Sequence, residues 1–181
     1  MLFRSSLTTD TGGTLNLNGG AITTTGAQSY GEAVTLGANT TLSSTGAGAI
    51  GFSSTVNGAY GLTVNTTGAT TFDGAVGGAA PLASLTTDAN GTLALNGGAI
   101  TTTGAQSYGD AVTLGANTTL SSTSAGAIGF SSTVNGAYGL TVNTTGVTTF
   151  GGIIGGSTAL TSLTTDANGT LVMNGGAITT T

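Results

Sequence analysis

The composition of the chain excludes several classes of protein before any motif is considered. Of its 181 residues, 34 are Gly, 5% are aromatic and only 4% are charged, which is not the make-up of an ordinary globular core. The formal net charge is −5 and Arg4 is the single base, so nothing neutralises phosphate groups and we expect no binding to nucleic acid or insertion into membranes. The absence of Cys excludes disulfides and thiolate metal sites.

The sequence is organised by a long internal repeat. Residues 6–83 recur without a gap as residues 84–161, and the repeat begins a third time over residues 162–181. The low charge and the mean hydropathy of +0.32 argue against disorder. We therefore expect a single domain over residues 1–181, in which two full repeats and one partial repeat stabilise one another.

Short strands are predicted along the first repeat. Apolar residues alternate with polar ones at residues 15–17, 34–36 and 62–64, which is the period-2 pattern of β-strands, and no window shows a helical period. An aromatic residue is followed four places later by Val at residues 30–34, 52–56 and 72–76. Turn-forming clusters of Gly, Asn and Ala follow at residues 37–39, 57–59, 77–79 and 96–98.

These periods predict an all-β fold, a parallel β-helix or β-solenoid with coils of about 19–20 residues and four coils per 78-residue repeat. Equivalent strands on successive coils would pair in parallel and bury their apolar side chains. The expected inward residues are the aromatic and aliphatic residues of the three segments and of their copies: Tyr30, Val34, Phe52, Val56, Phe72, Val76, Tyr108, Val112, Phe130, Val134, Phe150 and Ile154. Alternation cannot place both Ile153 and Ile154 inside, so a corner or bulge is expected at Ile153.

The coils resemble the repeat regions of very large bacterial surface proteins. Residues 21–45, AITTTGAQSYGEAVTLGANTTLSST, and residues 51–76, GFSSTVNGAYGLTVNTTGATTFDGAV, are similar to the repeats of filamentous-haemagglutinin-like adhesins exported by two-partner secretion, and of related proteins with β-strand repeats. The resemblance covers nearly all of the chain after Ser6. It implies a right-handed solenoid, secretion and display at the cell surface, and it is specific to this architecture and not to an activity.

Carboxylates are the only side chains that a catalyst could use. Equivalent carboxylates, such as Glu32 and Asp110, are one repeat apart, which is about 19 Å if a repeat holds four coils. Glycoside hydrolysis by paired carboxylates needs separations of roughly 5–9.5 Å. We therefore expect no catalytic site, and a carbohydrate-active β-helix enzyme is kept only as an alternative. The Gly-Gly-x-Gly-x-Asp pattern of calcium-binding repeats is also absent, so neither a metal nor another cofactor is expected.

Rows of Thr supply a second functional hypothesis. If Ile22, Leu42, Leu62 and Val64 point inward, several neighbouring polar residues would point outward on one column of strands. This candidate surface row consists of Thr23, Thr25, Ser43, Thr45, Thr63 and Asn65. A flat Thr-x-Thr array on a solenoid resembles the surface of some antifreeze proteins and would bind ice or another flat surface. The alternative is that Thr is simply a polar residue suited to an exposed strand.

Six Asn residues match the N-glycosylation pattern, namely Asn39, Asn65, Asn90, Asn117, Asn143 and Asn168. The alternative for these residues is Asn stacked from coil to coil at the corners.

The sequence as a whole favours an extracellular structural rod or fibre of a bacterium, with no chemistry of its own. Two forms stay open: a repeat segment of a longer adhesin, flanked by further repeats, or a filament subunit whose copies stack end to end. Contact with a cell surface or matrix is compatible with both.

Overall fold

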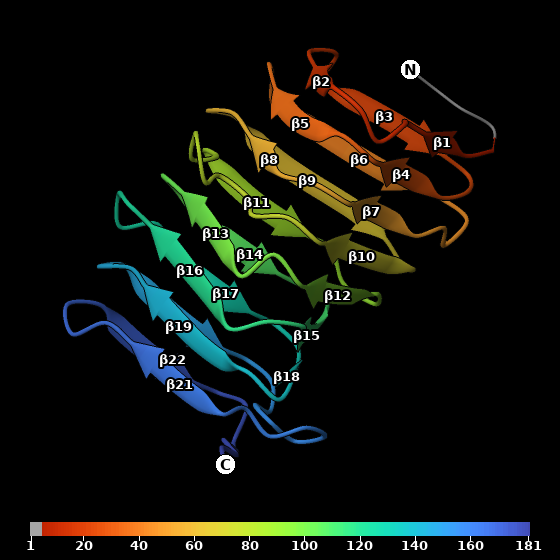
Figure 1. Ribbon diagram of the computed structural model, residues 1–181. Coiled ribbons are helices and arrows are strands. Elements are labelled where there is room, and N and C mark those ends of the chain that lie inside the picture. Colours follow the sequence, from red (N-terminus) through yellow and green to blue (C-terminus); the bar gives the residue numbers. More distant parts are fainter. Residues whose placement is uncertain (1–4) are drawn as a thin grey trace.

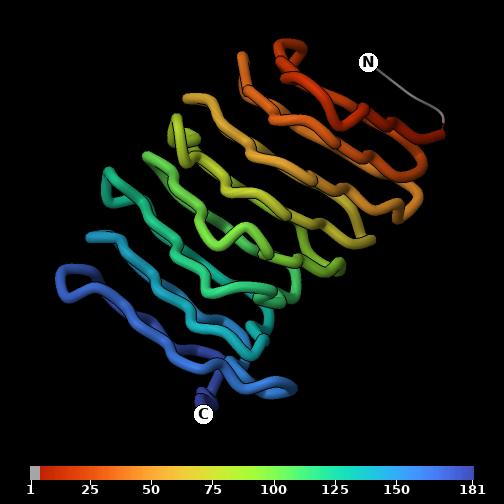
Figure 2. The backbone as a smooth tube through the Cα atoms, viewed as in Figure 1, coloured from red at the N-terminus to blue at the C-terminus, as the bar shows by residue number. Residues whose placement is uncertain are grey.

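The computed structural model describes residues 5–181, so Arg4 lies outside the described residues. These residues form 22 short strands, and they contain no helix, hence none that could cross a membrane. The chain winds around one axis in stacked coils (Figures 1 and 2), and its strands pair from coil to coil to form three faces. We name these faces A, B and C.

Every coil contributes one strand or one bridged residue to each face; faces A and B are each built on one parallel sheet, and face C consists of two parallel sheets joined through Val76. Face A contains β3 (Ala21–Thr24), β6 (Thr40–Ser44), β9 (Gly61–Thr66), β11 (Ser84–Thr87), β14 (Gln106–Tyr108), β17 (Ile128–Phe130), β20 (Val147–Phe150) and β22 (Thr170–Met173). Face B contains β1 (Leu7–Thr8), β4 (Gln28–Tyr30), β7 (Ile50–Phe52), β10 (Ala69–Phe72), β12 (Thr92–Leu95), β15 (Ala111–Leu114) and β18 (Val134–Asn135), continued by the bridged residues Ile154 and Ile178. Face C contains β2 (Thr14–Leu17), β5 (Ala33–Leu36), β8 (Val56–Asn57), the bridged residue Val76, β13 (Ala99–Thr102), β16 (Thr118–Ser122), β19 (Gly139–Asn143) and β21 (Ser162–Thr165).

This arrangement confirms the predicted all-β parallel solenoid. Face A has eight strands, one per coil, and each strand pairs with its equivalent on the neighbouring coil rather than with the next strand in sequence. A single coil has no partner strand of its own, so the fold depends on stacking. The right-handedness implied by the resemblance stays a prediction.

The coil length differs from the predicted value and changes how the repeats are arranged. Residues in register on successive coils are from 19 positions apart (Leu93 and Val112) to 24 positions apart (Val76 and Ile100). A 78-residue repeat therefore contains eleven strand positions, the strands β1 to β10 plus Val76, at three positions per coil. The prediction of four coils per repeat is corrected to three and two-thirds, and each repeat is turned by one face relative to the repeat before it.

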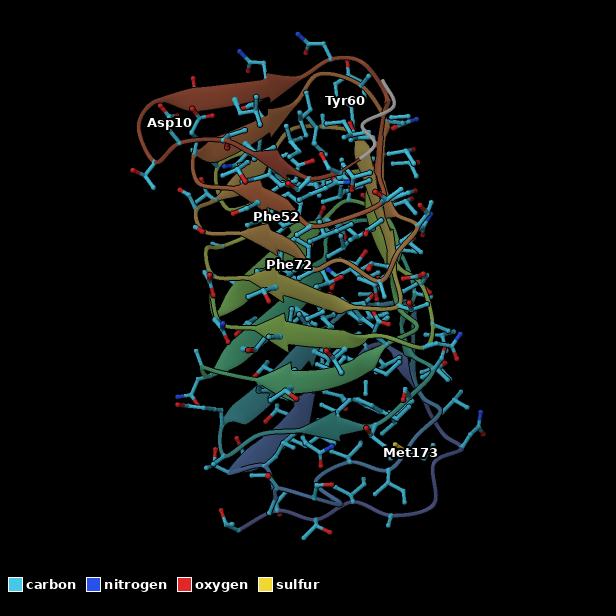
Figure 3. All side chains as sticks on the ribbon, turned by 90° about the vertical axis from the view of Figure 1, so that its right-hand side faces the viewer. Asp10, Phe52, Tyr60, Phe72 and Met173 are labelled. Carbon is cyan, nitrogen blue, oxygen red and sulfur yellow. The ribbon has the colours of Figure 1, made fainter. Side chains whose placement is uncertain are left out.

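The core consists of columns of identical or similar side chains. All twelve residues predicted to point inward are buried, which confirms that part of the prediction. Tyr30, Phe52 and Phe72 stack on successive coils with ring centroids 5.0 and 4.9 Å apart, and Figure 3 shows Phe52 and Phe72 one above the other. Their copies form a second stack on face A. Such stacking contributes about 0.5–1.5 kcal/mol per pair beyond simple burial.

A polar network is buried beside Tyr30 and beside its copy Tyr108. The Tyr30 hydroxyl donates to Gln28 Oε1 at 2.7 Å, and Gln28 Nε2 donates to the Ser43 carbonyl at 2.9 Å and to Thr24 Oγ1 at 3.2 Å. The second repeat has the same bonds around Gln106 and Tyr108. Burial raises the pKa of Tyr30 far above its usual value, so the hydroxyl remains a donor at any physiological pH.

The residues that lie outside the strands form the corners between them. Ile153 lies outside any strand, at the corner before the buried Ile154, and is 43% exposed, as the prediction of a corner requires. At another corner the buried Gly58 has φ of +125°, and a Cβ there would collide with the Leu36 carbonyl oxygen. Only Gly combines that backbone angle with that close approach.

Candidate functional site

The candidate Thr surface row is divided between two rows and a corner. Thr23, Ser43 and Asn65 are in register on β3, β6 and β9, whereas Thr63 pairs with Thr41 in the neighbouring row. The strands β3 and β6 end at Thr24 and Ser44, so Thr25 and Thr45 lie beyond them. The last two side chains are exposed, and the four on the strands are only partly exposed. The expectation of one outward column is therefore corrected, because β9 is shifted relative to the assumed alignment.

The face that carries these residues does not keep Thr from coil to coil. The row of Thr63 contains, along face A, Ala21, Thr41, Thr63, Thr86, Ser107, Gly129, Thr149 and Val172. The mixture arises because successive repeats are turned by one face, so face A receives different segments of the repeat. A flat, regular Thr array is absent from this row, and the ice-binding hypothesis gains no support from it.

Acidic residues meet in pairs that the sequence analysis did not predict. Asp10 and Glu32 are separated along the chain by one coil, and so are Asp88 and Asp110. Because β1 pairs with β4 and β11 with β14, each pair lies at the same corner on two successive coils. Asp10 lies on the turn at one end of the solenoid in Figure 3. The expectation that the carboxylates stand about one repeat apart considered only equivalent residues and is corrected by this pairing.

One carboxyl of each pair, Glu32 and Asp110, has a raised pKa. A hydrogen bond with Asp10 raises the pKa of Glu32, and burial and the charge of Asp10 raise it further. Burial raises the pKa of Asp110; the Gly91 N–H lowers it, the charge of Asp88 raises it and the Thr87 hydroxyl lowers it. Within residues 5–181 no base is present to compensate either pair. Protonation of Glu32 and of Asp110 is therefore the simplest way to avoid an uncompensated charge at these two side chains.

Asp110 is the most deeply buried charged group of the described chain. Its side chain is 1% exposed, and Oδ1 accepts the Gly91 N–H at 2.9 Å. Oδ2 has no hydrogen-bond partner that satisfies normal geometry, and neither has the nearby Thr87 hydroxyl. At the same corner, the Thr66 N–H donates a hydrogen bond to Asp88 Oδ1 at 2.9 Å. These two bonds link three successive coils at this corner.

The chemistry available to the carboxyl pairs is narrow. Two carboxyl groups bonded to each other, as in Asp10 and Glu32, leave no space between them for a sugar or a water molecule. No cluster of three or more side chains suited to a metal ion occurs among residues 5–181, and calcium requires six to eight oxygen ligands. The pairs therefore have the character of pH-sensitive structural contacts.

Asn residues at the corners bind the next coil. Asn39 Oδ1 accepts the Gly61 N–H at 2.9 Å, and Asn57 Oδ1 accepts the N–H groups of Ala79 and Ala80 at 2.9 and 3.2 Å. The second repeat forms equivalent bonds through Asn117 and Asn135. Asn39 and Asn117 thus bind the next coil, as the corner interpretation expects, but each accepts a Gly N–H and is not stacked on another Asn.

Comparison of the chain with models of protein families, with curated proteins and with solved structures gives no match.

Proposed function

We propose that this chain is a structural segment of an extracellular bacterial rod or fibre, with no enzymatic activity of its own. The observation that carries the proposal is the coil-to-coil pairing, which runs without a gap from the first strand to the last on all three faces. A solenoid of this kind grows in one dimension, so its length is set by the number of repeats.

The interior supports a mechanical role. It is filled by aliphatic columns and by two aromatic stacks, and the corners are joined by Asn side chains and by acidic pairs. Bonds of this kind link neighbouring coils along the axis, which is the direction in which a fibre is loaded. The partners in this proposal are flanking repeats of a longer chain or other copies of this one, with a cell surface or matrix at its ends.

Display outside the cell rests on the resemblance to bacterial adhesin repeats. Immunolabelling of intact cells of the organism that makes it would test this location. Labelling only after the cells are lysed would contradict it.

Rod growth is tested by solution scattering from the natural chain and from a chain with one additional 78-residue repeat. The longest dimension should increase by about 18 Å per repeat, because three and two-thirds coils are added at about 4.8 Å each, while the cross-section stays constant. A matched chain in which Val56→Asp places a charge in the core is the control for correct stacking. An increase in cross-section instead of length would contradict the proposal.

A further inference from the structure

The two full repeats allow one coil to be compared with and without a neighbour above it. The strands β2 (Thr14–Leu17) and β12 (Thr92–Leu95) are equivalent and differ only by Asn16 in place of Ala94. In the second repeat, β12 lies between β10 and β15, whereas β2 pairs with β5 alone and has an open edge among the described residues. The difference between the two shows what this coil surface is shaped to receive.

In the second repeat the surface is covered by β10. Phe72 is in register with Leu95, and the N–H groups of Asn96 and Gly97 donate to the Phe72 carbonyl at 2.9 and 3.1 Å. Asn96 Nδ2 also donates to Asp73 Oδ1 at 2.7 Å. The space bounded by Phe72, Gly74 and the turn after β12 leaves no room for a water molecule.

In the first repeat the same surface is open. A hollow of about 200 Å³ lies there, lined by Leu17, Ile22, Thr40 and the turn Asn18–Gly20. Leu17 is 8% exposed where its copy Leu95 is 2% exposed, and Ile22 is only partly buried where its copy Ile100 is buried. The N–H groups of Asn18 and Gly19 have no backbone acceptor within residues 5–181.

A Gly at the turn after β12, Gly97, allows the neighbouring coil to pack closely, and the first coil has the equivalent Gly19. A Cβ on Gly97 would collide with the Gly74 carbonyl oxygen of the coil above, so that coil packs directly against the Gly97 backbone. For the equivalent Gly19, no atom of residues 5–181 lies within 4 Å of the same position. The turn of the first coil thus has the same Gly surface on which a neighbouring backbone could pack closely, and no backbone of residues 5–181 lies against it.

We propose that the open edge of β2 and the hollow beside it are a docking site for a strand of the β10 type, supplied by another repeat of this kind. The occupant has the sequence Ala-Thr-Thr-Phe or Val-Thr-Thr-Phe followed by small turn residues. Its Phe side chain fills the hollow over Leu17, and its Phe carbonyl accepts the N–H groups of Asn18 and Gly19. This inference rests on the proposed function, since it names the partner that a rod built of repeats would place there.

The strand at the other end of this chain is a different one. The last strand, β22, ends at Met173, which is 38% exposed and lies over Phe150, and it lies on face A rather than on face C. An identical copy stacked without rotation would therefore place β21, with the sequence Ser-Leu-Thr-Thr, over β2 on face C. The geometry of the second repeat selects the Phe-bearing strand in preference to that copy.

The test extends the full chain by a copy of Gly58–Ala83 placed directly before Ser6, which supplies one additional coil. Hydrogen exchange at the amides of Asn18 and Gly19 should become at least tenfold slower and approach that of Asn96 and Gly97 in the same molecule. The control extension carries Phe72→Asp in the added copy and should leave Asn18 and Gly19 exchanging as in the natural chain, while Asn96 and Gly97 stay protected.

Two results would overturn the docking site. Unchanged exchange at Asn18 and Gly19 in the extended chain, with the second repeat still protected, would show that a β10-type strand does not bind there. Protection that rises with the concentration of the unextended chain would identify an end-to-end copy as the occupant instead of the Phe-bearing strand. Neither result bears on growth in length, which the scattering experiment measures separately.

Discussion

The buried carboxyl of Asp110 makes the stability of the fold depend on pH. This carboxyl faces Asp88 on the preceding coil and has a raised pKa. A carboxyl whose pKa is raised by folding stabilises the folded state fully below its ordinary pKa of about 4, and this stabilisation is lost as the pH rises through the higher folded value. The natural chain should therefore lose stability as the pH rises from about 4 towards neutrality.

The variant Asp110→Asn should remove this dependence on pH at the Asp88–Asp110 corner. Asn keeps the acceptor for the Gly91 N–H and has no charge to bury, so at pH 7 the variant should be more stable than the natural chain by about 1–3 kcal/mol, and at pH 3 the two should be equal. Thermal unfolding between pH 3 and pH 8, followed by circular dichroism, measures the difference.

The matched control for Asp110 is Asp166→Asn. Asp166 is the copy of Asp88 in the third repeat, and no acidic residue follows it in the sequence. Its replacement should change the pH profile little. A natural chain that is more stable at pH 7 than the Asp110 variant would mean that the buried carboxylate is well compensated, contrary to this argument.

Residues of the core were predictable where alternation alone decides the side that they face. Val34 and Leu36 are two positions apart on the single strand β5, so their shared inward orientation follows from local geometry. The acidic pairs were not predicted, because only equivalent positions in successive repeats were compared. The signal was present in the spacing from Asp10 to Glu32, which corresponds to one coil.

At the scale of the element, the Asn corners offer a direct test of coil-to-coil bonding. Asn57→Ala removes the acceptor of two N–H groups in the loop that follows Val76. Because the loop is partly exposed, water replaces some of the lost bonding, and the expected cost is about 0.5–1.5 kcal/mol. Hydrogen exchange at Ala79 and Ala80 should become faster, and the melting temperature should fall.

Asn16→Ala is the control for Asn57→Ala, because the second repeat already has Ala94 at the equivalent position of an exposed strand face. It should leave exchange and melting temperature nearly unchanged. Equal effects of the two substitutions would show that the Asn57 contact does not hold the next coil.

Coil length could not be obtained from the spacing of turn clusters. Strand positions require only two to six residues each, and the corners between them vary in length. Each repeat also contains a loop whose two ends pair with the same neighbouring segment of one face. In the first repeat the loop runs from Val76 to Leu82, and in the second it runs from Ile154 to Leu160. These residues were counted as regular coil, which is why the repeat was predicted to close after four coils. Only the pairing between coils shows on which face each segment of the repeat lies.

At the scale of the whole molecule, each repeat is turned by one face relative to the repeat before it, and this turn determines which residues each face exposes. Equivalent strands of the three repeats, β1, β11 and β21, lie on faces B, A and C in turn. Any exposed feature of the repeat therefore appears on every side of the rod, at a rise of about 18 Å per repeat. Three full repeats contain 33 strand positions, or eleven coils, after which the same face is reached again.

The turn of one face per repeat predicts the symmetry of a longer array. The natural chain has no Cys, so Thr8→Cys and the same substitution in each further repeat provide single labelling points on an exposed strand position. In an array of six repeats, electron microscopy of gold-labelled rods should show labels turned by 120° from one repeat to the next. Labels on the same side should recur about every 53 Å, which is eleven coils at about 4.8 Å. Labels along one side of the rod at about 19 Å intervals would instead mean four coils per repeat and would contradict the register of the sheets.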